Sequence, residues 1–310
     1  MPKRKPKSKK EVHQPDDKLF KEVMEKPANA IEYIKTHYAE LAEQLELSTF
    51  QVEREKLSIP NFKTFEADIV YTCKFKDSEE ELNISLLWEN KSEPDEYIFI
   101  QIGLYLFLRY YKMVKSENMK LEPIIPLIFY NGKKDWIPKS LTDLLKEHPF
   151  LGVFEKYLPQ FDFHFTNIGK VPMEELLKIE TAFFKSAMIA MANKYDYDLL
   201  LQLFPIIFEV EEEDEEITLV TYIFALHERL PEQIKKDVSP FSIKIKDTVM
   251  STFANFKKEG KKEGKKEGKI EGKIEVAQNM YEDGFTIEQI VRALRETEEF
   301  VKKAIESKKK

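Results

Sequence analysis

The sequence predicts an α/β fold in which a small mixed sheet is flanked by helices and followed by a helical C-terminal region. The apolar pattern changes from helical spacing near residue 20 to strand-like runs between residues 50 and 130. Beyond residue 135 the spacing becomes helical again, and a charged tail follows. The chain has 310 residues, of which 42% are hydrophobic, enough for one large or two medium domains.

The N-terminal segment 1–15 is rich in lysine and almost free of apolar residues, so we expect a disordered basic tail. Order is expected to begin at Asp16, because acidic residues favour the start of a helix. Pro27 separates this helix from a second one, whose apolar residues from Ile31 to Leu45 recur at helical spacing.

The predicted core, residues 16–145, contains the strands. A polar turn joins two β-branched, aromatic runs, which predicts a hairpin. A long helix that is apolar nearly all round then precedes another buried strand, so we expect this helix to be buried against the sheet. The predicted strands are 50–55, 65–75, 82–88 and 124–130, and the long helix is 97–112.

Residues 146–256 are predicted to be a mostly helical extension packed on or beside the core. Residues 257–275 repeat Lys-Lys-Glu-Gly. Each glycine costs about 1 kcal/mol relative to alanine in a helix, so a solvated linker and a self-associating helix both remain open. Residues 276–310 predict a short helical pair, which either packs and oligomerises or contacts DNA. A homo-oligomer through this tail is one expectation.

The charge distribution argues against non-specific nucleic-acid binding by the body of the protein. The net charge is −7, but segment 1–15 carries +5 and segment 257–310 carries +3, so residues 16–256 carry −15. Part of this acidity lies in residues 209–216, which we expect to be solvated. Because neutralising phosphates supplies most non-specific affinity, DNA contact would need the basic ends, a basic groove or a divalent cation.

Composition excludes several classes of protein. Cys73 is the one cysteine, and the five histidines are scattered, which argues against a disulfide scaffold or a zinc site. No apolar run is long enough to cross a membrane, and the N-terminus lacks the apolar segment of a secretory signal. We expect a cytoplasmic protein, associated with the nucleoid if it binds DNA, and no membrane partner.

Asp68, Glu89 and Lys91 are the candidate catalytic residues. Glu89 and Lys91 follow strand 82–88 and project to the same side of an extended chain, and hairpin register could bring Asp68 beside Glu89. Two carboxylates and the backbone carbonyl of Asn90 would bind Mg²⁺ or another divalent cation. Lys91 would orient or activate a metal-bound water and offset negative charge. The alternative is a solvent-facing Asp68 and a Glu89–Lys91 surface pair.

Gln101 is a lone polar residue within the apolar face of helix 97–112. A buried glutamine needs hydrogen-bond partners, and Lys91 or a bound phosphate would provide them. A glutamine satisfied by the core without a role at the site is the other interpretation.

Several short motifs together resemble those of one family. They are Asp17–Lys21, Leu45–Thr49, Asp68–Tyr71, Leu87–Asp95 and Ile124–Gly132, together with the Glu-Gly tail and its helical pair. The sequence resembles the Rpn family of recombination-promoting nucleases, the YhgA-like putative transposases, within the PD-(D/E)XK nuclease superfamily. The resemblance covers roughly residues 16–145 and the tail.

The resemblance implies a restriction-endonuclease-like PD-(D/E)XK core and a metal-dependent DNA endonuclease, with Asp68, Glu89 and Lys91 at the catalytic positions. Ala67 replaces the proline that gives the superfamily its name. Some members carry glutamine in place of Lys91, so the lysine here favours an active site. Asp17 matches a recurrent acid of the first helix, although charge at a helix N-terminus explains it equally well.

We therefore expect an Mg²⁺-dependent DNA endonuclease with a link to DNA recombination or transposition. Two alternatives remain open. One is a non-catalytic DNA-tethering or assembly protein built on a nuclease-like scaffold. The other is an RNA-directed nuclease that uses the same site.

Overall fold

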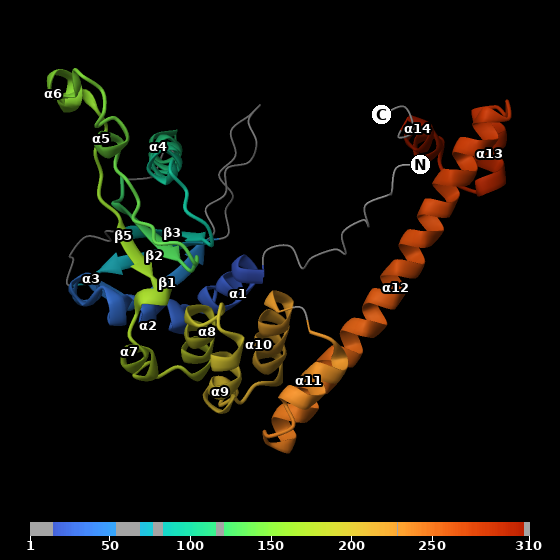
Figure 1. The fold of residues 1–310 in the computed structure, drawn as a ribbon. Coiled ribbons are helices and arrows are strands. Elements are labelled where there is room, and N and C mark those ends of the chain that lie inside the picture. The colour runs from blue at the N-terminus through green and yellow to red at the C-terminus, as the bar shows by residue number, and fades with distance from the viewer. Residues whose placement is uncertain (1–14, 54–68, 77–82, 116–120, 228, 307–310) are drawn as a thin grey trace. The chain divides into compact units, whose positions relative to one another are not determined.

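The computed structural model describes residues 15–53, 69–76, 83–115, 121–227 and 229–306. The chain divides into two compact units, Met1–Lys246 and Asp247–Lys310. The first unit contains the sheet and most of the helices, and the second contains the C-terminal helices (Figure 1).

A mixed sheet with the strand order β1-β2-β3-β4-β5 forms the centre of the first unit (Figure 1). The first three strands are antiparallel neighbours, whereas β4 is parallel to β3 and β5 is parallel to β4. The predicted α/β class, with a mixed sheet and flanking helices, is confirmed. The strands are β1 Leu45–Glu53, β2 Ile69–Phe75, β3 Asn83–Lys91, β4 Ile124–Tyr130 and β5 His164–Asn167.

β5 was not predicted, and it extends the sheet beyond residue 145, the expected end of the core. The strand has four residues, too few for its alternation to stand out from the surrounding pattern. Its place at the edge of the sheet depends on pairing with β4, where Leu127 lies opposite His164. That pairing is a long-range contact that local sequence does not encode.

The predicted helix that ended at Leu45 is instead two helices and the start of a strand: α2 Pro27–His37, α3 Ala39–Gln44, then β1. Tyr38 between the helices has φ −140° and ψ 56°, outside the helical region. Its hydroxyl lies 2.5 Å from Thr166 Oγ1, and its ring lies 4.2 Å from the ring of His164. Tyr38, the residue that interrupts the helix between α2 and α3, is therefore also the residue that contacts β5.

An aromatic core covers one face of the sheet, under α1 Pro15–Met24, α2 and α8 Ala182–Ala192 (Figure 1). Tyr33 is central, and its hydroxyl donates to Thr166 Oγ1 at 2.7 Å. Its ring contacts those of Trp88, Phe129 and Phe184, and Phe20 packs on Phe129 with ring centroids 5.1 Å apart.

The helix α4, Ile98–Lys115, covers the opposite face. Successive strand residues point to opposite faces, so Leu87 faces α4 whereas Trp88 faces the aromatic core, and both are fully buried. The inner side of α4 is buried as predicted, but its outer side is exposed. The cluster on this face contains Leu87, Ile98, Ile102, Tyr105, Leu106, Met113, Ile124 and Ile128.

The remaining helices of the first unit extend from the sheet. The mostly helical character predicted for residues 146–256 is observed. The helical spacing of residues 140–147, 173–192, 196–208 and 219–229 predicts four helices, which are present with shifted ends, and the one at 173–192 is interrupted between α7 and α8. α6 and α11 were not predicted. These helices are α5 Leu141–Leu144, α6 Leu151–Phe154, α7 Met173–Leu177, α9 Tyr197–Ile207, α10 Glu213–Leu226 and α11 Pro231–Asp237, with 3₁₀ turns at Glu155–Tyr157 and Ile168–Lys170.

One member of the acidic run 209–216 is not solvated. Glu216 is buried in the first turns of α10, and its carboxylate forms an ion pair with Lys244. The expectation of a fully solvated run is therefore wrong at this residue, because an ammonium group from a later helix compensates its burial.

The Lys-Lys-Glu-Gly repeat lies within one continuous helix, α12 Ile243–Glu282, so the helix rather than the linker is observed. The predicted helical pair follows as α13 Ile287–Leu294 and α14 Glu298–Glu306, and Thr286 forms the expected capping box with Gln289. The pair packs around Ala277, Ile290, Val301, Ala304 and Ile305.

Across the described residues, every helix falls short of the length and apolar character that a membrane span requires.

Phe129→Ala should lower the free energy of unfolding of the first unit by about 3–5 kcal/mol, because it opens a cavity beside Phe20 and Tyr33. Trp88 and Trp136 are the two tryptophans of the chain, and both lie in this unit, so tryptophan fluorescence in urea reports on it alone. Val153→Ala, at an exposed position, is the control and should change stability by less than about 0.5 kcal/mol. Equal losses for both variants would contradict the assigned core.

Gly268→Ala should stabilise α12 locally by about 1 kcal/mol, since the added methyl group meets no atom within 4 Å. Amide hydrogen exchange near residue 268 should slow by about five-fold. Gly284→Ala is the matched contrast. Gly284 has φ +88°, and alanine there should cost about 1 kcal/mol and speed exchange at the end of the helix. Faster exchange in Gly268→Ala would argue against the helix.

Candidate active site

Glu89 and Lys91 lie inside β3, whereas the sequence predicts them beyond the end of this strand. Pairing with β4 extends the strand, so that Glu89 lies opposite Ile128 and Lys91 lies opposite Tyr130. Because the two residues are separated by one position on an extended strand, their side chains share the face that packs under α4.

Gln101 joins these two side chains from the first turn of α4. Its Nε2 donates to Glu89 Oε1 at 2.6 Å, and its Oε1 accepts from Lys91 Nζ at 3.0 Å. The Lys91 ammonium also lies 3.2 Å from Glu89 Oε1. Gln101 thus has partners among the candidate site residues, and one of them is Lys91, the partner that its position in the sequence predicts.

Asp95 completes the cluster, with its Oδ2 3.1 Å from Lys91 Nζ. Burial, the largest single influence, would lower the pKa of Lys91, but the carboxylates of Glu89 and Asp95 together raise it above its ordinary value. In this environment the Lys91 side chain is a cation at neutral pH. Glu89 is only 5% exposed, and the nearby Lys91 ammonium balances the charge of its carboxylate.

The cluster opens onto a surface cleft of about 510 Å³. Glu89, Lys91 and Asp95 line it together with Asp17, which α1 contributes from the other side of β3. The walls are strongly acidic, because Glu93 and Glu96 also contribute. Asp17, singled out in the first helix, therefore lies at the same cleft as Glu89.

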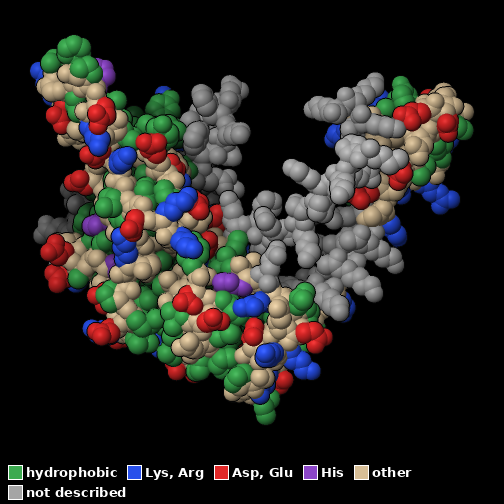
Figure 2. Space-filling view, in the orientation of Figure 1, with side chains coloured by type: hydrophobic (Ala, Val, Ile, Leu, Met, Phe, Trp, Pro, Cys, Tyr) green, Lys and Arg blue, Asp and Glu red, His purple; other side chains and the backbone are tan. Residues whose placement is uncertain are grey.

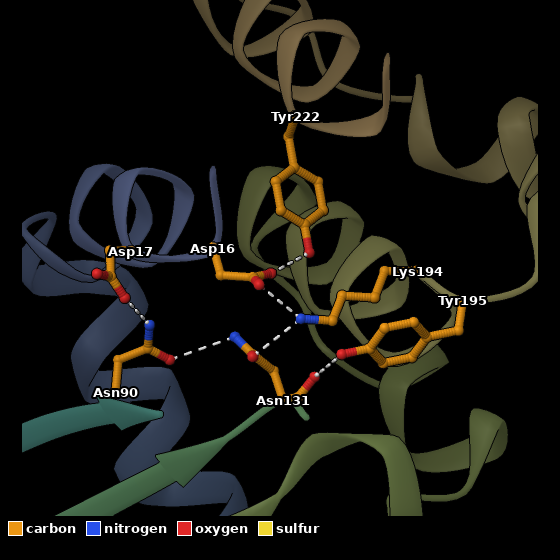
Figure 3. A network of polar contacts seen from close by, with 7 residues as sticks. All are labelled: Asp16, Asp17, Asn90, Asn131, Lys194, Tyr195 and Tyr222. Carbon is orange, nitrogen blue, oxygen red and sulfur yellow. Dashed lines mark hydrogen bonds and ion pairs between the residues drawn. The ribbon is translucent and has the colours of Figure 1, made fainter. Parts of the chain in front are cut away.

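Asn90 lies between Glu89 and Lys91 on β3, so its side chain points to the face opposite α4. There it begins a second polar network (Figure 3). Its Nδ2 donates to Asp17 Oδ1 at 2.7 Å, and its Oδ1 accepts from Asn131 Nδ2 at 3.3 Å. Asn131 follows β4, and its Oδ1 accepts from Lys194 Nζ at 3.0 Å. A chain of side-chain contacts therefore links the cleft to the end of α8.

Lys194 is buried beside Asp16 at the far end of this network (Figure 3). Lys194 Nζ lies 2.7 Å from Asp16 Oδ2, and the Tyr222 hydroxyl donates to Asp16 Oδ1 at 2.8 Å. Burial lowers the pKa of Lys194, and the Asp16 carboxylate opposes that effect. The lysine is 2% exposed, so this is a buried ion pair rather than a surface contact.

Sequence reasoning missed Asp16, Asn131, Lys194 and Tyr222 as members of a connected network. Asp16 is the residue at which order was expected to begin and Asn131 lies within the motif Ile124–Gly132, so their positions carried a weak signal. Lys194 and Tyr222 lie 178 and 206 positions from Asp16, and only tertiary structure brings them to it.

Asp68, the other candidate carboxylate, lies outside the described residues. The last described pair of the β2–β3 ladder is Ile69 with Trp88, and Asp68 and Glu89 are the next residues of the two segments. In the described part of the chain, no group of three His, Cys, Asp or Glu side chains is arranged to hold a metal ion. Metal binding by the Asn90 carbonyl stays a prediction.

Lys194→Met should lower the free energy of unfolding by about 3–5 kcal/mol, because it leaves the buried Asp16 carboxylate without its cation. The double variant Asp16→Asn, Lys194→Met should lose less than the sum of the single losses. Tryptophan fluorescence in urea measures both.

Lys185→Met is the control for that cycle, because Lys185, within α8, pairs with the more exposed Glu209 at 3.6 Å. Its loss should stay below about 1 kcal/mol. Additive effects of the two network substitutions would show that Asp16 and Lys194 do not act as a pair.

Comparison with known proteins places the chain in a family. Residues 14–218 match the family described as "Putative transposase, YhgA-like". Recombination-promoting nuclease RpnC of Escherichia coli (strain K12) is 23% identical over 128 residues, which are 41% of this chain and 42% of that protein. The chain thus matches less than half the length of this relative. No solved structure matches. Because the family match covers more than half of the chain, this protein belongs to that YhgA-like family, as its motifs predicted.

Proposed function

We propose that this protein is an Mg²⁺-dependent DNA endonuclease with a PD-(D/E)XK-type core, acting in recombination or transposition. The observation that carries the proposal is the Glu89–Lys91 pair, two residues on one face of β3 with their charged atoms 3.2 Å apart at an open cleft. Membership of the family and the name of the E. coli relative support the same reaction class.

The donor set suits a hard divalent cation, since it consists of oxygen atoms. In the proposal, the carboxylates of Asp68 and Glu89 and the backbone carbonyl of Asn90 hold Mg²⁺. Bound Mg²⁺ would polarise the phosphodiester and lower the pKa of a water molecule. Because the described carboxylates alone form no metal-binding group of three, the proposal depends on Asp68. The pairing of Ile69 with Trp88 supports its inclusion, because Asp68 and Glu89 are the next residues of the two segments.

Lys91 is proposed to orient the attacking water and to offset the negative charge that develops on the phosphate. Its ammonium is held in place by Glu89, Gln101 and Asp95. Because the cation is already fixed, it loses little conformational entropy when the reaction proceeds. Gln101 is a positioning residue, because it bonds Glu89 and Lys91 at the same time. Asp17 supports the site through Asn90.

The acidic cleft also explains why a cation is needed. Asp17, Glu89, Glu93, Asp95 and Glu96 line it, with Lys91 as the basic residue among them. Such a surface repels a phosphodiester unless a divalent cation stands between them. RNA carries the same phosphodiester, so assays on both nucleic acids decide the substrate class.

Lys91→Met, Glu89→Gln and Asp68→Ala should each reduce Mg²⁺-dependent plasmid cleavage by at least about 100-fold, because each removes a charge at the reacting phosphate. Glu93→Gln is the control. Glu93 lines the same cleft but is largely exposed and bonds Lys134, so its loss should leave cleavage near the wild-type rate. Tryptophan fluorescence verifies that every variant is folded.

Wild-type cleavage rates in folded Lys91→Met or Glu89→Gln would refute the assignment. A gel-shift assay on the same proteins separates the reaction from binding. A wild-type chain that shifts DNA but never cuts it with Mg²⁺ or Mn²⁺ would establish the alternative, a DNA-tethering protein on a nuclease-like scaffold.

A further inference from the structure

The outer side of α4 carries an apolar stripe that no described element covers. Five of its residues are 51–68% exposed, whereas Leu104 is half-buried. Figure 2 shows hydrophobic side chains, in green, at the surface over α4. The stripe, called the α4 stripe below, consists of Tyr97, Ile100, Leu104, Phe107, Tyr111 and Val114.

The spacing within the α4 stripe specifies the shape of its partner. Its residues are separated by alternating steps of three and four positions, the repeat that packs one helix against another by knobs into holes. Single exposed apolar residues are ordinary, but a continuous stripe along a whole helix marks an interaction surface. The partner that fits such a stripe is a helix with the same repeat.

The α4 stripe is complementary to itself when two copies run antiparallel. Tyr97 of one copy then lies opposite Val114 of the other, Ile100 opposite Tyr111, and Leu104 opposite Phe107. Every apolar residue meets an apolar residue, and one two-fold axis relates all contacts, as an interface between identical subunits requires.

Charge selects the antiparallel over the parallel arrangement. The segment before α4 carries Glu93 and Glu96, whereas the last turn of α4 carries Lys112 and Lys115. Antiparallel packing places the acidic end of one copy beside the basic end of the other, and it opposes the two helix dipoles. Parallel packing would bring like charges together at both ends.

The area is sufficient for a specific dimer. An 18-residue helix is about 27 Å long. With about 100 Å² exposed for each large side chain, the stripe would bury roughly 600 Å² per subunit and roughly 1,200 Å² in total, the lower end of specific interfaces. We propose that this protein forms a two-fold symmetric homodimer in which two copies of α4 pack antiparallel through the α4 stripe.

Sedimentation of the full chain tests the interface. Wild type should be a dimer, and Phe107→Glu should weaken the dimer by at least about 100-fold, because it buries two unpaired carboxylates near the two-fold axis. Leu230→Glu is the control. Leu230 is 66% exposed and Phe107 is 64% exposed, but Leu230 lies outside the stripe, so this variant should remain dimeric. A monomeric wild type, or a dimer that Phe107→Glu leaves unchanged, would overturn the proposal.

Disulfide cross-linking tests the direction and excludes a dimer formed by the tail alone. The one native cysteine, Cys73, is buried, so it gives little background. Tyr97→Cys and Val114→Cys, made as separate proteins of different tagged mass, should cross-link when mixed and not when alone. Cross-links within either separate sample would indicate a parallel pair, and the absence of any cross-link would indicate another surface. Either result would overturn the proposed dimer.

Discussion

The parallel pairing of β3 with β4 is the constraint on which the site depends. It keeps the chain extended through Lys91, and an extended chain sends alternate residues to opposite faces. Glu89 and Lys91 therefore meet Gln101 under α4, while Asn90 turns toward α1. The same pairing fixes the apolar residues Leu87 and Trp88 in two different cores. A shift of one residue in β3 would exchange these faces and bury the charges in the aromatic core.

Two lysines belong to the polar networks of this strand, the partly buried Lys91 at its end and the buried Lys194, and their surroundings give them opposite properties. Lys91 contacts two carboxylates, so its pKa rises despite burial, whereas burial outweighs the one close carboxylate beside Lys194 and lowers its pKa. Lys91 borders an open cleft, whereas Lys194 is 2% exposed and pairs with Asp16 of α1, which Tyr222 of α10 also contacts. Breaking either pair would leave a carboxylate uncompensated, so each lysine also stabilises its part of the fold.

Local pattern predicts the parts of the fold that depend on neighbouring residues. The antiparallel pairing of β2 with β3, the bounds of β4, the capping box at Thr286 and the shared side of Glu89 and Lys91 all follow from spacing, whereas the predicted turn between β2 and β3 lies outside the described residues. β5 and the break at Tyr38 depend on pairing and on Thr166, far along the chain, and spacing alone does not encode them. Apolar content predicted that α4 is buried but could not show that only one side of it meets the sheet. The position of Asp68 stays a prediction.

The Asp16–Lys194 pair has a consequence for how this family can vary. Asp16 opens the first helix, and its cation arrives 178 positions later, after β5 and most of the helical region. Segments of the chain on either side of residue 145 are therefore interdependent at a buried contact. A chimaera that joins the first 145 residues of this chain to a C-terminal part without a lysine at position 194 would leave the buried Asp16 carboxylate without its cation, so a change in one segment calls for a compensating change in the other.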